Sequence, residues 1–168
     1  MILVETLLYL LRGGEVLLIL KKRGLGAGLY NGVGGKVKPG ETPEEAAVRE
    51  AVEEIGVKPL QLNWGGLLEF WNFVDGGVES VHYVHVFTSN SYVGEPRESE
   101  EAIPHWFRRE EVPYDKMWED DRYWLPIVLG GGRIYGRFEF QKWKLRRWSL
   151  YLLEEASQPL LDLVKLGT

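Results

Sequence analysis

The sequence predicts a single domain of mixed α/β (α+β) type. Apolar runs of strand length alternate with clusters of Gly, Pro, Asn and Asp, the pattern of short strands joined by turns. One segment in the first third of the chain has instead the spacing and caps of an amphipathic helix. With 168 residues, 45% of them hydrophobic, the chain suffices for one hydrophobic core without disulfides.

We expect strands where an apolar run is bounded by such turns. The first two runs are separated by Arg12-Gly13-Gly14-Glu15, which indicates a tight hairpin. Farther along, the segment from Arg133 to Gln141 alternates polar and apolar residues, as a half-buried strand does. The expected strands span residues 2–11, 15–22, 65–74, 79–88, 102–107, 133–141 and 145–153.

The helix signal is strongest after Thr42. A capping threonine, a proline for the first helical position and Glu45 three residues after the cap specify its start, and Gly56 specifies its end. Its apolar stripe is expected to consist of Ala47, Val48, Ala51, Val52 and Ile55. A second helix is expected at about 121–129, and a short one after about 158.

Composition excludes several classes of protein. With no cysteine, the chain has neither disulfides nor Cys-ligated zinc or iron–sulfur sites. The net charge of −5 argues against a nucleic-acid polymer as partner. No apolar stretch approaches the ~20 residues of a membrane span, and the apolar start lacks the basic region of a signal peptide. We therefore expect a cytoplasmic protein.

Three glutamates crowd one side of the predicted helix. Glu50, Glu53 and Glu54 lie three and four residues apart and so project together. The simplest explanation is a solvated charged face with Arg49 nearby. The alternative is a partial shell for Mg²⁺, which prefers carboxylate oxygens and substrate phosphate. The preceding segment 34–40 favours the alternative, because its glycines allow close backbone approach and its lysines suit a phosphate chain.

The segment from Gly35 to Val57 matches the pattern GX₅EX₇REUXEEXGU, where U is apolar. Its fixed positions are filled by Gly35, Glu41, Arg49, Glu50, Glu53, Glu54 and Gly56. On these residues the chain resembles the Nudix family. The resemblance implies a mixed β-sheet sandwiched between helices and the hydrolysis of a nucleoside diphosphate linked to another group.

The same resemblance implies roles for the motif. Glu50, Glu53 and Glu54 would bind Mg²⁺ or Mn²⁺, joined by the Gly35 carbonyl. Arg49 would orient the glutamates, and Glu41 would be structural. Either Glu53 or Glu54 would act as the catalytic base, and the sequence does not separate them.

Further segments resemble one branch of that family, the oxidised purine nucleoside triphosphatases, which cleanse the nucleotide pool and so prevent DNA damage. They are 21–37, 106–107, 117–126 and 136–141, and the resemblance extends over roughly residues 6–151. It implies one Nudix domain over 1–168, with about 154–168 as an extra C-terminal tail.

This second resemblance implies a base-binding pocket. Asn31, Asp120 and Asp121 would hydrogen-bond the base, and Trp118 would stack on it. Without the resemblance, the aspartates are explained by a helix N-terminus and the tryptophan by the core. Two neighbouring carboxyls in an apolar pocket seldom both ionise, so one would donate a hydrogen bond and the other accept one.

Other residues are weaker candidates. Thr6, Lys21 and Phe70 are further pocket residues, and Leu25 stands where the resembled proteins have an aromatic residue. Glu101 matches an acidic position that can join the metal cluster, with a solvated loop as the alternative. A metal site shared by His82 and His85 is not expected, because residues three apart in a strand point to opposite faces.

Together these features predict a Mg²⁺-dependent pyrophosphohydrolase that converts oxidised purine nucleoside triphosphates, of the 8-oxo-dGTP and 2-hydroxy-dATP type, to monophosphate and pyrophosphate. One alternative is a Nudix hydrolase of ADP-ribose, dinucleoside polyphosphates or unmodified dNTPs. Another is a noncatalytic nucleotide-binding module. The oligomeric state and the preferred oxidised base stay open.

Overall fold

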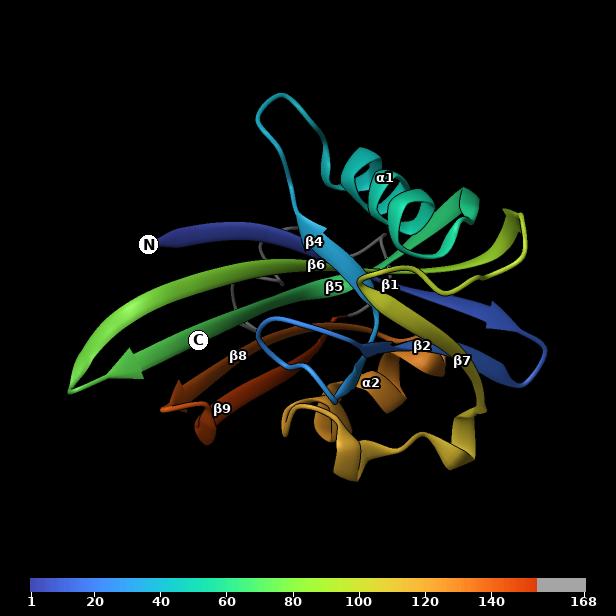
Figure 1. Cartoon of the computed structure of the whole chain (residues 1–168). Coiled ribbons are helices and arrows are strands. Elements are labelled where there is room, and N and C mark those ends of the chain that lie inside the picture. The colour runs from blue at the N-terminus through green and yellow to red at the C-terminus, as the bar shows by residue number, and fades with distance from the viewer. Residues whose placement is uncertain (154–168) are drawn as a thin grey trace.

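In the computed structural model, which describes residues 1–153, the chain forms one mixed sheet of nine strands with a helix on either face (Figure 1). The helices are α1 (Pro43–Ile55) and α2 (Asp121–Leu129). Two 3₁₀ turns, η1 (Arg109–Glu111) and η2 (Tyr114–Lys116), precede α2. The strands are β1 (Ile2–Arg12), β2 (Glu15–Lys21), β3 (Tyr30–Asn31), β4 (Val33–Lys36), β5 (Lys58–Val74), β6 (Gly77–Val93), β7 (Ala102–Arg108), β8 (Arg133–Gln141) and β9 (Lys144–Leu153).

The predicted strands and the two helices before residue 153 are confirmed, with differences at their ends. β5 starts seven residues before the predicted 65–74, and β6 extends beyond 79–88 at both ends, because the two pair along almost their whole length. β3 and β4 were not predicted. They are short, lie in a glycine-rich stretch, and exist through pairing with β2 and β1. The helix predicted after about 158 lies outside the described residues.

The caps of α1 are as predicted. The Thr42 hydroxyl accepts from the Glu45 amide, the Glu45 carboxylate accepts from the Thr42 amide, and Gly56 ends the helix in the left-handed region. The predicted apolar stripe is partly wrong, because Val52 is 45% exposed. The buried face is rotated toward the small side chains, which let the helix approach the sheet closely; it consists of Ala46, Ala47, Ala51 and Ile55.

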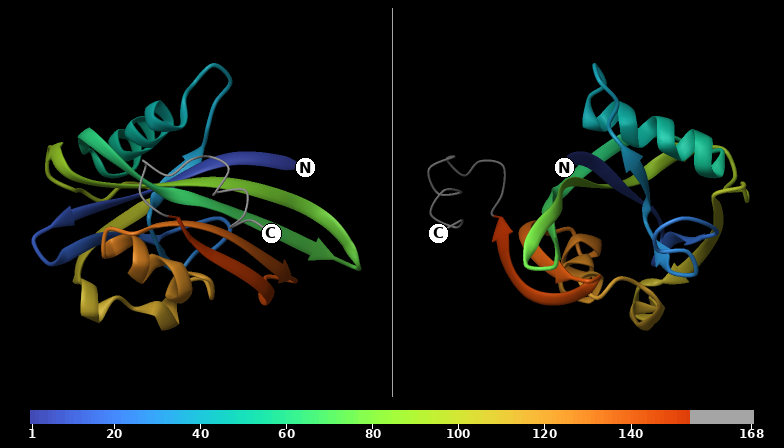
Figure 2. Two further views of the ribbon diagram at one scale, coloured as in Figure 1. Left: turned by 180° about the vertical axis from the view of Figure 1, so that it is seen from behind. Right: turned by 60° about the vertical axis from the view of Figure 1, so that its left-hand side comes forward.

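Strand alternation divides the core into two layers. On β1, Leu8 and Leu10 pack toward α1, whereas Tyr9 packs toward α2 beside Trp124. The central strands follow the order β2-β1-β6-β5-β8-β9, with β1 and β6 parallel, and the sheet curves around the α2 side (Figure 2). The helices formed by the described residues are too short and too polar to span a bilayer.

Candidate active site

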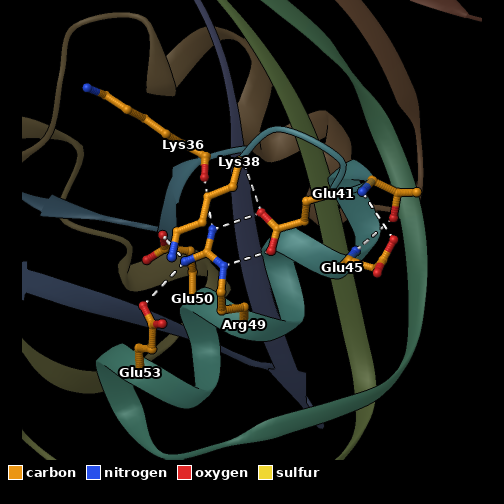
Figure 3. A network of polar contacts seen from close by, with 8 residues as sticks. Lys36, Lys38, Glu41, Glu45, Arg49, Glu50 and Glu53 are labelled. Carbon is orange, nitrogen blue, oxygen red and sulfur yellow. Dashed lines mark hydrogen bonds and ion pairs between the residues drawn. The ribbon is translucent and has the colours of Figure 1, made fainter.

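Arg49 of α1 is the centre of an ion-pair network (Figure 3). Its guanidinium holds both oxygens of Glu41, at 2.7 and 3.0 Å, and lies 2.8 Å from Glu50 Oε1 and 3.3 Å from Glu53 Oε2. It also donates to the Lys36 carbonyl, at 3.0 Å. The hydrogen bonds from Arg49 lower the pKa of Glu41 to about 2. The network fixes the loop before α1 onto the helix.

The three glutamates of the motif differ in environment. Glu53 has a side chain 55% exposed and turns to Arg49, whereas Glu50 is 15% exposed and lies against Gly35. Glu54 is largely buried, and its Oε2 has no hydrogen-bond partner within residues 1–153. Burial, and then the charge of Glu50, raise the pKa of Glu54 to about 8. The positive charge of Lys21 lowers the pKa of Glu54, so Lys21 also lies near this carboxyl.

This arrangement bears on the predicted metal ion. Across residues 1–153, no three side chains of His, Cys, Asp or Glu are gathered so that they could hold an ion. Arg49 explains this, since it draws Glu50 and Glu53 toward itself. The unpartnered Glu54 oxygen, the adjacent Glu50 carboxylate and the bare Gly35 backbone nevertheless fit a hard divalent cation, because a buried carboxylate needs a positive partner.

We expect Gly35→Ala to cost most of the activity. A Cβ at this position would lie 2.5 Å from Glu50 Oε1 and so would displace that carboxylate. Steady-state kinetics should show kcat lowered about tenfold or more, while thermal unfolding changes little. Gly40→Ala provides a comparison in the same loop with open space around the new Cβ, although its backbone φ is +80°. Full activity of Gly35→Ala would contradict the prediction, because it would show that catalysis does not depend on the position of the Glu50 carboxylate.

We expect the metal-free protein to lose stability as the pH rises from about 4.5 to about 8. The folded-state pKa of Glu54 is raised, so in this window the unfolded chain has released a proton that the folded protein retains. The free energy of unfolding therefore falls as the pH rises. Urea unfolding in chelator should show a smaller fall for Glu54→Gln than for the wild type. Identical pH profiles would contradict the burial of this carboxyl.

One cavity of about 270 Å³ extends from Glu54 to the N-terminus of α2. All seven residues predicted to bind substrate line it: Thr6, Lys21, Asn31, Phe70, Trp118, Asp120 and Asp121. Gly35, Glu54, Glu101 and Leu25 line it as well. Arg49, Glu50 and Glu53 are not among the lining residues. Glu101 is paired with Arg23, which lowers the pKa of this glutamate.

The two aspartates are each 2% exposed at one end of the cavity. Trp124 Nε1 donates to Asp120 Oδ2 at 2.8 Å, whereas Asp121 Oδ2 and the Tyr9 hydroxyl have no partner among the residues described. Burial raises the pKa of Asp120 to about 6. Burial, and then the charge of Asp120, raise the pKa of Asp121 well above its ordinary value. Both shifts favour retention of a proton by the pair, and the pKa of Asp121 is raised further than that of Asp120.

Aromatic rings form the cavity walls beside the aspartates. Trp118 meets Phe140 edge to face, with ring centroids 6.2 Å apart, and lies 6.1 Å from Trp143. Phe70 lies against Phe140 at 6.1 Å. A Cβ on Gly26 would come within 3.2 Å of Trp118, so the loop after β2 packs closely on this indole. A flat heterocycle suits such walls.

Several lining residues were not predicted: Glu5, Asn72, His82, Phe140 and Trp143. Period-two alternation from Phe70 and Val84 would have placed Asn72 and His82 on the cavity side. Glu5 required knowledge that β1 lies beside β6. His82 and His85 do point apart, as expected: His82 lines the cavity, and His85 contacts Trp64.

Comparisons with known proteins agree with this geometry. The sequence model of the NUDIX domain matches residues 2–127. The chain is 45% identical to the oxidized purine nucleoside triphosphate hydrolase of Danio rerio and 43% identical to that of Mus musculus, each over 81% of this chain and 85% of the relative. The crystal structure of a mutator MutT protein from Bacillus halodurans superposes with a TM-score of 0.80 at 26% identity, covering 94% of this chain and 99% of the other. These matches agree with the motif of α1 and with the mixed sheet and its two helices. The chain belongs to the Nudix family.

Proposed function

We propose that this protein is a Mg²⁺-dependent pyrophosphohydrolase of oxidised purine nucleoside triphosphates that cleanses the nucleotide pool. The observation that carries the proposal is the cavity, which is lined both by the buried Asp120/Asp121 pair and by Glu54, whose Oε2 is buried and unpartnered among the described residues. The names of the relatives from Danio rerio and Mus musculus support the choice of substrate. A cytoplasmic location, and a single domain over 1–168 with a tail from about 154, remain predictions.

At the phosphate end, the residues suited to a divalent ion are Gly35, Glu50 and Glu54, with Glu53 and Glu101 as further ligands. Nudix hydrolases generally use such ions, and a bound Mg²⁺ or Mn²⁺ would neutralise phosphate charge and lower the pKa of a coordinated water. Lys21 lines the same end of the cavity and supplies a positive charge for the phosphate chain. Arg49 pairs with Glu50 and Glu53, so a bound ion would compete with its guanidinium for these carboxylates.

Between the two candidate bases, the environment favours Glu54. A general base works best when its pKa lies near the working pH. In the metal-free protein burial, and then the charge of Glu50, raise the pKa of Glu54 to about 8, and the group lines the cavity. Glu53 is more than half exposed and paired with Arg49. We therefore assign proton acceptance from the attacking water to Glu54.

At the base end, the aspartates provide one acceptor and one donor. Asp120 accepts hydrogen bonds as a carboxylate, and Asp121 donates one from its retained proton. Asn31 adds an amide whose oxygen already accepts from the Gly32 amide, which leaves its NH₂ group to donate. Trp118 covers the face of the base. Because the two carboxyls titrate as a coupled pair, the proton can move to the other aspartate, and purines with different donor patterns can be accommodated.

The proposal is tested by kcat/KM with Mg²⁺ for 8-oxo-dGTP, 2-hydroxy-dATP, dGTP and ADP-ribose, with the phosphate product identified. Strong preference for an oxidised purine, with release of pyrophosphate, is the expected result. Comparable rates for dGTP, or a preference for ADP-ribose, would assign the chain another Nudix specificity. Tight nucleotide binding without turnover would make it a noncatalytic module.

A further inference from the structure

Polar side chains from three neighbouring strands meet in a diagonal line across the sheet. On β1, β6 and β5, the side chains facing α2 are apolar along most of each strand and include Tyr9, Val84 and Phe70. Toward the β5–β6 turn, where the three strands run side by side (Figure 1), polar residues appear among them: Glu5 lies level with Val84, His82 with Phe70, and Ser80 with Asn72. We call this set the polar row: Glu5 of β1, His82 and Ser80 of β6, and Asn72 of β5.

The polar row is connected by hydrogen bonds. Asn72 Nδ2 donates to Ser80 Oγ at 3.0 Å, Ser80 Oγ lies 3.2 Å from His82 Nε2, and His82 Nδ1 contacts the Glu5 carboxylate. A carboxylate only accepts, so Nδ1 of the imidazole carries a proton. Ser80 Oγ and His82 Nε2 form the next hydrogen bond of the row. The hydrogen bonds thus connect Asn72 through Ser80 to His82, and His82 Nδ1 donates to Glu5.

The row has free acceptors toward the cavity. Asn72 and Ser80 are buried, at 6% and 4% exposure, while the side chains of His82 and Glu5 are 19% and 24% exposed. Glu5, Asn72 and His82 all line the cavity. In the part of the chain that the structure describes, Glu5 Oε2 and the Asn72 amide oxygen have no protein partner. A ligand that displaces water from these oxygens must offer them matching donors, because an unsatisfied polar group costs free energy once it is buried.

The row lies away from the aspartate pair. Tyr9 stands near Asp121: burial, and then the charges of Asp121 and Asp120, raise the pKa of the Tyr9 hydroxyl well above its ordinary value. Glu5 precedes Tyr9 by four residues on the same strand, which corresponds to about 13 Å. A purine held by its Watson–Crick edge at the aspartates directs its five-membered ring and ribose away from them. The polar row is therefore placed to meet the far edge of the base.

That edge is where oxidation changes the hydrogen-bonding pattern. In an unmodified purine N7 is an acceptor, whereas an 8-oxopurine carries N7–H, a donor. A carboxylate accepts a hydrogen bond from N7–H of the oxidised base and is repelled by the N7 lone pair of the unmodified base. The geometry points to Glu5, positioned by His82, as the residue that accepts a hydrogen bond from N7–H of an 8-oxopurine and so discriminates against the unmodified nucleotide. This inference rests on the proposed function and adds a second determinant of its specificity.

The test compares wild type and Glu5→Gln by kcat/KM on 8-oxo-dGTP, dGTP, 7-deaza-dGTP and 8-oxo-GTP. The variant should lower the ratio of 8-oxo-dGTP to dGTP about tenfold, the effect expected for a hydrogen bond to a charged group. The wild type should accept 7-deaza-dGTP, which lacks the N7 lone pair, better than dGTP, and this difference should vanish in the variant. The ratio of 8-oxo-GTP to 8-oxo-dGTP should not change.

Controls separate this role from a structural one. Glu69→Gln removes a carboxylate from the same sheet that contacts Trp71 and Tyr135 rather than the cavity, and should leave every ratio unchanged. Ser80→Ala interrupts the row behind His82 without touching the cavity lining, and should shift the 8-oxo-dGTP to dGTP ratio in the same direction by a smaller factor. If Glu5→Gln does not fold, as judged by circular dichroism, His82→Gln should show the shift instead.

The outcomes are distinguishable. A wild type with no preference for oxidised purines would overturn both the proposed function and this inference. A wild-type preference that Glu5→Gln retains would overturn the inference alone. A change in the ribose ratio, with the oxidised-to-unmodified ratio intact, would overturn it too, because the donor met by Glu5 would then be a ribose hydroxyl.

Discussion

Replacing Glu54 by Gln is expected to lower kcat by about 10²- to 10⁴-fold, the contribution typical of a general base. Glu54 is the largely buried carboxyl of the motif, it lines the cavity, and its Oε2 lacks a protein partner among the described residues. Glutamine has the same shape but neither accepts a proton nor balances a cation. Because burial already favours the neutral form of this side chain, the variant should fold and melt at or above the wild-type temperature.

Two comparisons make this prediction specific. Glu44→Gln changes an exposed glutamate in the first turn of the same helix and should leave kcat unchanged. Glu53→Gln alters a side chain paired with Arg49 and should cost less than Glu54→Gln. Titration with Mn²⁺ then shows whether the Glu54→Gln variant still binds the ion. If it does, the loss of activity is the loss of the general base. If Glu53→Gln is the more damaging variant, the base has been assigned to the wrong glutamate.

The parts of the fold that the sequence predicts well depend on local chemistry. The start of α1 follows from Thr42 and Glu45, whose side chains and amides bond each other within one turn. The motif glutamates are likewise fixed by their spacing on one helix. β3 and β4 have no such local signal, because they exist only through partners elsewhere in the chain.

The same distinction holds within the site. All seven predicted substrate residues line one cavity, since the resemblance carried their positions from related chains. Helical spacing places Glu53 on the same side of α1 as Glu50 and Glu54. It does not show that Glu53 pairs with Arg49 at an exposed position, so this orientation could not be predicted. The link between Glu5 and His82 was also hidden, since they are 77 residues apart and meet through the parallel pairing of β1 with β6.

Asp120→Asn is expected to lower kcat/KM for 8-oxo-dGTP about 10- to 100-fold, mainly through KM, while Mn²⁺ binding is unchanged. The carboxylate accepts from Trp124 Nε1 and lies beside Asp121, whose pKa is raised well above its ordinary value by burial and then by the charge of Asp120. The amide oxygen of asparagine can still accept from Trp124 Nε1. The NH₂ group, a donor, then faces Asp121 or the base in place of a carboxylate oxygen. The variant therefore loses hydrogen bonds to a charged acceptor, each with an effect of about 1.5–3 kcal/mol.

A pH profile distinguishes this role from a purely structural one. Burial raises the pKa of Asp120 to about 6, so below that pH the acceptor gains a proton and kcat/KM of the wild type should fall. Asp120→Asn has no such group and should lack the inflection. Asp115→Asn, at a side chain 97% exposed, provides the control and should keep the wild-type profile. Equal losses by Asp120→Asn for every nucleotide, with the inflection retained, would instead mean that this aspartate serves only to anchor Trp124.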